Sequence, residues 1–371
     1  MKITLFLGAG ASTPFGKPTT VQLKDKLSKE FPFSLEMPFL PRFFDHKEYP
    51  DIEYILQSVK DIRNFLDSYG GKFFSHAGFG LHFQTNHGQI PFVNFVKDIK
   101  KIQDVLEEKI FENYSWRHTE DNNLSYIYDE IFSFIRKYSD QMIVITTNYD
   151  RAIEEYCENQ NKQIRCIDGF QLSGSRFLWA KGDYGYAGNN NNGNDLFLYK
   201  LHGSLNWKKH EKYDIERTTE EWKPKDPNYE ENMLVYPTLS PKDGYEKEPY
   251  KSIRDNFVKM MDISDLCIVI GFSFRDIHIN DIFLKFLKNG KTIIVISPDA
   301  WISYNTNLLN VHLTEKEILQ FRDAPITREQ IKIDGVECGH ILTIQKKVEV
   351  RTIKEIMHDV KRLIEPEKHP F

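Results

Sequence analysis

Four short apolar runs recur along this chain of 371 residues, and small or polar residues follow each of them directly. The runs are ITLFL at 3–7, MIVIT at 142–146, LCIVI at 266–270 and TIIVI at 292–296. Such runs, apolar on both faces and mostly β-branched, are typical of strands buried on both sides of a parallel sheet. Helical patterns follow three of them, at 19–29, 150–159 and 277–288. This alternation predicts an α/β fold with a Rossmann-like, doubly wound, mainly parallel sheet that binds ligands beyond the carboxyl ends of its strands.

A long insertion separates the first two predicted strands. Its helical patterns lie at 51–68, 91–112 and 124–138, and we expect the last to pack back on the sheet. The stretch 69–90 has no clear period, and we predict a loop there. We therefore assign 1–31 and 139–310 to the Rossmann-like domain, and 32–138 to a mainly helical insertion over the cleft.

The remaining segments are predicted from composition and turn chemistry. The run GYAGNNNNGND at 185–195 is typical of a flexible loop, and the charged stretch 211–232 of a surface excursion. Residues 330–345 form a candidate hairpin with Asp334-Gly335 at its turn, and an amphipathic helix is predicted near 352–364. We assign 311–371 to a C-terminal hairpin plus helix that serves assembly or partner binding.

Composition excludes several classes of protein. The formal charge of −5 argues against a broad nucleic-acid-binding surface. No apolar run approaches the roughly 18–20 residues that span a bilayer, and the first run is too short for a signal peptide. The four cysteines contain no C-x-x-C pair, so we expect neither structural zinc nor any other metal site. Nothing in the sequence calls for disulfides, which favours a cytoplasmic location.

A glycine turn, Gly8-Ala9-Gly10-Ala11-Ser12, follows the first apolar run. Glycines at this place let the backbone approach a pyrophosphate, while the start of the next helix offers N–H groups to its negative charge. Thr13 stands where the dehydrogenase fingerprint has its third glycine. A plain strand-to-helix turn explains the same residues.

Polar residues also follow the second run. Asn148 carries both a donor and an acceptor, which suits holding a ribose hydroxyl or a water molecule. Thr147 precedes it as a second candidate contact. Asp150 is first of all a cap for the following helix, and a ligand contact second.

His202 follows the strand-like run LFLYK and precedes Gly203, which places it at a strand end. A neutral imidazole accepts a proton from a hydroxyl group or a water molecule near pH 7. A single histidine is more often structural, and the chain has twelve in all.

The third and fourth runs supply further candidate ligand contacts. Gly271, Ser273 and Phe274 follow the third run, and Ser297 and Asp299 follow the fourth, where an acidic or small polar side chain can meet an adenosine ribose. Asp276, by contrast, is interpreted as a helix cap.

In this order the motifs resemble those of the sirtuin superfamily. Its GAGxS turn is similar to Gly8 to Ser12, and its TQNxD motif to 146–150 with Thr147 replacing glutamine. Its catalytic histidine–glycine pair matches His202-Gly203, and its later glycine–serine turn matches Gly271 and Ser273. The resemblance spans roughly 1–300. It implies that NAD is bound as a substrate, with Asn148 and His202 as the catalytic residues.

Two departures bear on the branch of the family. Deacylating sirtuins carry a zinc-binding cysteine quartet and a G-I-P-x-F-R segment, whereas this chain has no quartet and reads GKPTT at 16–20. The motifs LHGSLNW and GFSFRD, together with the long insertion, look more like those of the zinc-less, NAD-hydrolysing effectors of bacterial antiviral defence than like those of deacylating sirtuins. That resemblance implies an NAD glycohydrolase (NADase) that forms homo-oligomers, with control by a partner such as a HerA-type ATPase.

Two other functions remain open for the same cleft. One is transfer of ADP-ribose to an acceptor, as in a deacylase or an ADP-ribosyltransferase. The other is non-catalytic sensing of NAD or a related nucleotide. Product analysis separates the three, because only hydrolysis releases ADP-ribose without a modified acceptor.

Overall fold

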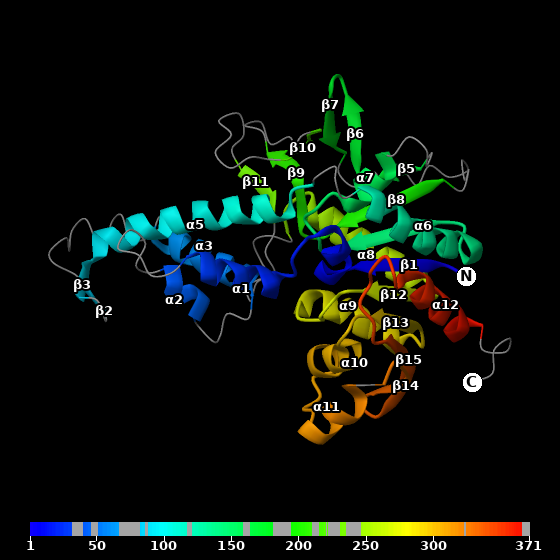
Figure 1. Ribbon diagram of the computed structural model, residues 1–371. Coiled ribbons are helices and arrows are strands. Elements are labelled where there is room, and N and C mark those ends of the chain that lie inside the picture. Colours follow the sequence, from blue (N-terminus) through cyan, green and yellow to red (C-terminus); the bar gives the residue numbers. More distant parts are fainter. Residues whose placement is uncertain are drawn as a thin grey trace.

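The computed structural model describes residues 1–31, 40–45, 51–66, 82–85, 88–116, 121–158, 164–180, 194–209, 215–219, 221, 231–234, 246–322 and 324–365. Its centre is an eight-stranded sheet in the order β14-β15-β13-β12-β1-β4-β8-β5 (Figure 1). The strands are β1 (Ile3–Leu7), β4 (Met142–Thr146), β5 (Arg165–Ile167), β8 (Asp195–Lys200), β12 (Leu266–Ile270), β13 (Thr292–Ile296), β14 (Ile326–Ile333) and β15 (Val336–Ile344). All neighbouring pairs are parallel except β14 with β15. The four apolar runs are the strands predicted from them, and the expected mainly parallel sheet is confirmed.

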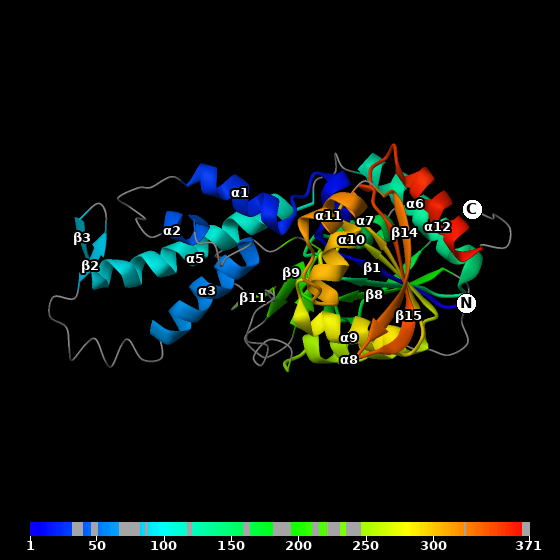
Figure 2. The same ribbon diagram turned by 90° about the horizontal axis from the view of Figure 1, so that it is seen from below.

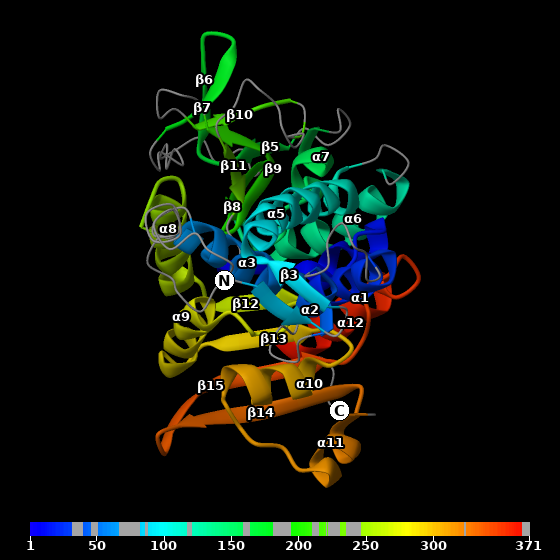
Figure 3. The same ribbon diagram turned by 90° about the vertical axis from the view of Figure 1, so that its left-hand side faces the viewer.

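Helices cover both faces of this sheet (Figures 2 and 3). One face packs against α8 (Tyr250–Ile263), α9 (Ile277–Lys288), α10 (Ala300–Ser303) and the π-helix η4 (Tyr304–Leu308), with α11 (Glu315–Arg322) beyond them. The other face packs against the 3₁₀ helix η1 (Ala9–Phe15), α6 (Asp121–Tyr138), α7 (Ala152–Glu158) and α12 (Ile353–Ile364). Side chains of β1 alternate accordingly, with Phe6 in the first core and Leu5 and Leu7 in the second. The doubly wound arrangement explains why these runs are apolar at every position.

The hydrogen-bond pattern between neighbouring strands continues into the first residue of the loop that follows each central strand. Backbone N–H groups of Gly8, Thr147, Leu201 and Gly271 donate to carbonyls at the ends of the neighbouring strands, at 2.8–3.1 Å. Four loops from distant parts of the chain therefore begin side by side at one edge of the sheet, where open α/β sheets bind ligands.

A helical arm projects from the sheet on the side of these loops (Figures 1 and 2). It consists of α1 (Thr20–Glu30), α2 (Leu40–Asp45), α3 (Ile52–Phe65), the hairpin of β2 (His82–Thr85) and β3 (Gly88–Pro91), and α5 (Phe92–Tyr114). The helices share a core of their own, and α6 packs on the sheet as expected. The prediction of a loop at 69–90 is wrong for the two strands, and its other residues lie outside the described ranges.

A second, five-stranded antiparallel sheet stands beside β8, in the order β11-β9-β10-β7-β6. Its strands are β6 (Phe170–Ser173), β7 (Arg176–Trp179), β9 (Gly203–Lys209), β10 (Ile215–Arg217) and β11 (Glu231–Leu234). The interpretation of 211–232 as a surface excursion is therefore wrong at β10, since Ile215 and Glu216 are buried. Most of the predicted loop at 185–195 lies outside the described residues.

The C-terminal hairpin continues the main sheet, because β15 pairs in parallel with β13. Its predicted turn is confirmed: Asp334 and Gly335 both have positive φ, at 53° and 79°, as a primed two-residue turn requires. The segment after β15 returns to the edge where the loops gather. No described helix combines the length and the hydrophobicity that crossing a bilayer requires.

Candidate active site

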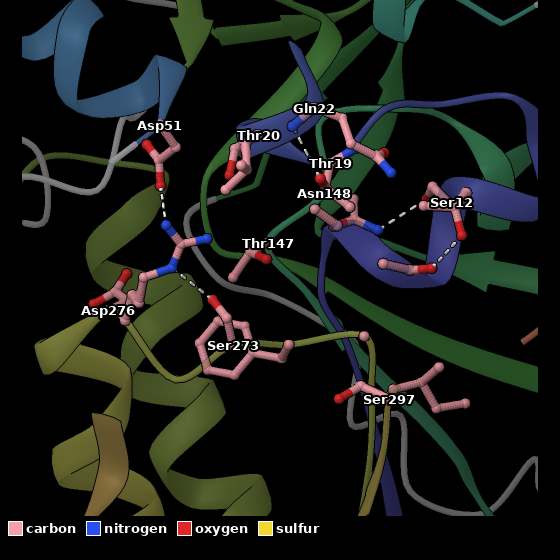
Figure 4. A pocket seen from close by; sticks show the side chains of 18 of the residues that line it. Ser12, Thr19, Thr20, Gln22, Asp51, Thr147, Asn148, Ser273, Asp276 and Ser297 are labelled. Carbon is pink, nitrogen blue, oxygen red and sulfur yellow. Dashed lines mark hydrogen bonds and ion pairs between the residues drawn. The ribbon is translucent and has the colours of Figure 1, made fainter. Parts of the chain in front are cut away.

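A cavity of about 550 Å³ opens at the carboxyl edge of the main sheet (Figure 4). Its lining comes from the loops after β1, β4, β8, β12 and β13, from the starts of α1 and α3, from the end of α5, and from 346–348. Small-molecule sites typically enclose roughly 300–1,000 Å³. The cavity thus has the size of a ligand site and the position that the sequence predicts for one.

Most of the predicted site residues lie around this single cavity, although they come from five separate loops. The lining includes both predicted catalytic residues, Asn148 and His202. The predicted ligand contacts along it are Ala9, Gly10, Ser12, Thr147, Asp150, Gly271, Ser273, Ser297 and Asp299. The structure brings these residues to one cavity, and their roles toward a ligand remain predictions.

Three predicted ligand contacts do not line the cavity. Gly8 packs beneath the loop after β12, and Ala11 belongs to the core on the η1 side of the sheet. Phe274 is fully buried in an aromatic cluster, although its backbone has a positive φ of 55°. The structure therefore places these three behind the lining of the cavity, and their contact with a ligand remains a prediction.

The glycines of the first turn are explained by close packing against a second turn. A Cβ on Gly8 would lie 2.6 Å from the Gly271 carbonyl oxygen, and one on Gly10 would lie 2.8 Å from Gly271 Cα. The Gly10 N–H donates to the same Gly271 carbonyl at 2.9 Å. This N–H is therefore committed to the protein backbone, and the binding of a pyrophosphate by the turn remains a prediction.

Asn148 is held by the first turn through one end of its amide. Its Nδ2 donates to the Gly8 carbonyl at 3.0 Å. It also donates to Ser12 Oγ at 2.9 Å (Figure 4). Its Oδ1 is buried and, within the described part of the chain, accepts no hydrogen bond. A buried acceptor without a donor is uncommon in proteins. The arrangement leaves a fixed acceptor that suits a ligand hydroxyl or a water molecule.

His202 is fixed by a carboxylate from the start of α9. Its Nε2 lies 3.2 Å from Asp276 Oδ2, and both side chains are buried. Burial alone would raise the pKa of Asp276, but the hydrogen bond and charge of His202, with two backbone N–H groups, lower it. A neutral imidazole that donates from Nε2 to this carboxylate has its lone pair on Nδ1. The predicted capping role of Asp276 is confirmed as well, because its Oδ1 accepts from His278 N and Ile279 N.

Asp150 has the structural role that was expected first. Its carboxylate accepts a hydrogen bond from Ala152 N, at the start of α7, at 3.0 Å. Below it, the buried Lys200 ammonium donates to the Asp150 carbonyl and pairs with Glu154 at 2.9 Å. This buried pair anchors the loop that carries Asn148.

Two acidic residues of the arm reach the cavity, and neither is predicted from the sequence. Asp51 caps α3 with its Oδ1, and its Oδ2 accepts from Arg275 Nη1 at 2.8 Å. Arg275 Nε also donates to Ser273 Oγ at 3.1 Å (Figure 4). Glu53, in the first turn of α3, lines the cavity, and its Oε1 accepts from the Tyr149 hydroxyl at 2.6 Å. An Asp before a helical pattern is a readable cap signal, but nothing local indicates that this helix end meets the cleft.

Glu53 titrates far from the usual range of a glutamate. Burial raises the pKa of Glu53 most, and the nearby charge of Asp51 raises it further. The charge of His202 and the hydrogen bond from Tyr149 oppose this shift only in part, which leaves the pKa of Glu53 at about 7. A carboxyl group with a pKa near neutrality is suited to accept and release protons.

Glu53→Gln is expected to raise the free energy of unfolding above that of the native chain. This gain should be larger at about pH 8 than at about pH 5, by roughly 2–3 kcal/mol. The folded state holds the Glu53 proton up to a pKa of about 7, whereas the pKa of an ordinary glutamate is 4.5. Between these values the folded state binds more protons than the unfolded state, so native stability falls as pH rises. Glutamine is neutral throughout and lacks this loss.

Urea unfolding of the native and variant chains at both pH values measures this difference. Glu337→Gln, on the exposed end of β15, is the matched control and should show no such pH dependence. An equal stability change at both pH values for Glu53→Gln would contradict the raised pKa.

The expected absence of zinc remains a prediction. All four cysteines are free thiols. Across the ranges that the structure describes, no three His, Cys, Asp or Glu side chains form a group that holds a metal ion.

The parallel sheet wound on both faces and the cavity at its carboxyl edge define a Rossmann-like α/β protein with a small-molecule site. Residues 142–320 match the family model of the SIR2-like domain. This segment runs from β4 through most of α11 and includes Asn148 and His202; it covers just under half of the chain. A comparison with curated proteins gives no match.

Solved structures of Sir2 homologues are similar over nearly the whole chain, at low identity. A mutant Sir2 homologue with 2′-O-acetyl ADP ribose is 14% identical, covers 98% of this chain and 93% of its own, and has a TM-score of 0.43. A second mutant, with ADP ribose, is 14% identical with coverages of 98% and 92% and a TM-score of 0.40. Sir2 with a p53 peptide and NAD⁺ is 12% identical with the same coverages and a TM-score of 0.37. These similarities are too distant to transfer the role of any residue.

Proposed function

We propose that this chain binds NAD in the cavity and hydrolyses the nicotinamide–ribose bond to give nicotinamide and ADP-ribose. The observation that carries the proposal is the meeting of Asn148 and His202 at one cavity with the glycine turn, although the two lie more than fifty residues apart. The match of 142–320 to the SIR2-like domain supports the choice of an NAD-dependent reaction.

The residue inventory suits this chemistry. In NAD the nicotinamide ring is cationic and departs neutral, so its departure needs no general acid, whereas an ordinary glycosidase uses a carboxyl pair. The protein must instead orient the ribose, stabilise an oxocarbenium-like transition state and admit water. We assign Asn148 Oδ1 to hold the ribose or the attacking water, and His202, oriented by Asp276, to act as a base, directly or through a ribose hydroxyl.

The far side of the cavity suits the adenosine half of the dinucleotide. Ser297 and Asp299 line it there, and Ser297 Oγ donates to Asp299 Oδ1 at 2.9 Å. Ser303 Oγ donates to the other carboxylate oxygen at 3.0 Å, so the carboxylate has a fixed orientation. A fixed carboxylate after a strand is a common partner of ribose hydroxyls.

Mass spectrometry of the products tests the proposal. Incubation of the purified chain with NAD is expected to give nicotinamide and ADP-ribose in equal amounts. Nicotinamide with a modified acceptor would instead show ADP-ribose transfer, as in a deacylase or an ADP-ribosyltransferase. Tight NAD binding without any product would indicate a sensor.

We further propose that the enzyme is an NAD-depleting effector of antiviral defence in the cytoplasm. An unrestrained NADase would exhaust the NAD of its own cell, so low resting activity is required. Control by homo-oligomerisation and by a partner such as a HerA-type ATPase fits this need, by analogy with related effectors. The same product assay, repeated with the protein encoded beside this chain, should show a faster reaction if that protein is the partner.

A further inference from the structure

The carboxyl group of Glu53 enters the cavity from the helical arm, outside the segment that matches the SIR2-like domain. It is partly exposed, and the surface that it faces is the cavity itself. The Tyr149 hydroxyl holds Oε1 at 2.6 Å, and the Tyr149 ring lies 6.4 Å from the His202 ring, centroid to centroid. Glu53 therefore lies near His202 and lines the same cavity as Asn148.

A buried polar group of α5 also lines the cavity. Tyr114, at the end of α5, lines it, and its hydroxyl has no hydrogen-bond partner among the described residues. Native proteins seldom bury a hydroxyl without a partner. An unmet hydroxyl near Glu53 is the arrangement expected where a water molecule or a ligand hydroxyl binds.

The arm is fixed at this point, so the position of Glu53 is fixed as well. Asp51 ties the start of α3 to Arg275 at 2.8 Å, and Arg275 is tied to Ser273. The ionisable groups that act on Glu53 or feel its charge come from every neighbouring element. They are Asp51 and Tyr54 at the start of α3, Tyr114 of α5, Tyr149 after β4, His202 after β8 and Asp276 at the start of α9.

We propose that Glu53 is a catalytic residue that accepts the proton of the water attacking the ribose, an inference that rests on the proposed NAD hydrolysis. The water oxygen forms a bond to the ribose carbon, and the carbon–nitrogen bond breaks with its electron pair going to the nicotinamide ring. One proton of the water passes to the Glu53 carboxylate and is later released to solvent. The step is balanced and consumes only NAD and water.

The geometry divides the work between Glu53 and His202. His202 is only 3% exposed and its Nε2 is engaged with Asp276, which suits an action on a ribose hydroxyl deep in the site. Glu53 is the more open of the two. With a pKa of about 7 it is ionised in a large fraction of molecules at neutral pH, yet basic enough to take a proton from water.

Glu53→Gln and azide together test the assignment. The variant is expected to release nicotinamide about 10²–10⁴-fold more slowly, while its Kd for NAD stays unchanged. Azide is a nucleophile with no proton to lose, so it should restore nicotinamide release in Glu53→Gln and yield 1-azido-ADP-ribose. In the native chain, kcat should rise with pH through an apparent pKa near 7, and Glu53→Gln should lack this rise.

Two further variants keep the test decisive. Glu53→Asp keeps a carboxylate and should retain part of the activity together with the pH dependence. Glu107→Gln is the matched control, because burial also raises the pKa of this glutamate of the arm, which accepts from Gln103 and does not line the cavity. Its turnover should equal that of the native chain.

Two results would overturn the inference. One is native turnover in Glu53→Gln. The other is a loss that azide does not restore in a variant whose circular dichroism matches the native chain and which unfolds at no lower temperature. Absence of nicotinamide release from the native chain would reject the proposed hydrolysis itself, and this inference with it.

Discussion

Replacing His202 by alanine is expected to slow nicotinamide release from NAD by about 10²–10⁴-fold, equivalent to roughly 3–5 kcal/mol of transition-state stabilisation. The reason is geometric. The imidazole lines the same cavity as Asn148, and Asp276 fixes its orientation at 3.2 Å. An alanine side chain neither accepts a proton nor holds a ribose hydroxyl, so the loss should appear in kcat more than in the Kd for NAD.

The fold should survive this change, because Asp276 keeps two other partners. Its Oδ1 still accepts from His278 N and Ile279 N at the start of α9. Thermal unfolding and circular dichroism check this point. His312→Ala, at an exposed position, is the control and should leave turnover unchanged. Near-native NAD loss in folded His202→Ala would reject the assigned role.

The two bases are distinguished by the same added nucleophile. Azide replaces the water and removes the need for a proton acceptor, so it should restore Glu53→Gln. It should not restore His202→Ala if His202 acts on the ribose, because the ribose would still be misplaced. Asn148→Ala should behave like His202→Ala, since its amide oxygen is assigned to hold the ribose or the water.

The main sheet is predictable from the sequence because its signals are local. Each central strand is a continuous apolar run, and the Asp334-Gly335 turn requires only two residues to adopt positive φ. The site follows from the same logic, since parallel strands bring the loops after their carboxyl ends to one edge. Asn148 and His202 meet for this reason alone.

The second sheet and the contribution of the arm are not predictable in this way. β10 has only three residues, with charged side chains at two of them, and it depends on pairing with β7 and β9. The helix that carries Glu53 is evident from its period, but its docking depends on the Asp51–Arg275 pair, which joins residues 224 positions apart. Phe274 is predicted as a ligand contact because it lies in a loop at the carboxyl edge of the sheet. Its side chain instead packs in the aromatic core, and nothing local in the sequence indicates this.

Gly271→Ala is expected to destabilise the protein by about 2–5 kcal/mol and to abolish NAD binding. The residue has a φ of 64°, a conformation that costs an L-residue roughly 1–2 kcal/mol. A Cβ here would also lie 2.4 Å from Ala11 N and 2.5 Å from Gly10 C, so the two turns must separate, which typically costs about 1–3 kcal/mol or more. Their separation would displace Ser12, the partner of Asn148, and Ser273, the partner of Arg275.

Gly290→Ala separates the backbone cost from the packing cost. Gly290 has a similar φ of 75°, but a Cβ there would meet nothing within 4 Å. It should therefore lose only about 1–2 kcal/mol and keep its affinity for NAD. Urea unfolding and calorimetric titration with NAD measure both effects. Equal stability losses in the two variants would mean that the turn at Gly10 and the turn at Gly271 separate without cost. The close packing of these turns, on which the proposed site depends, would then be contradicted.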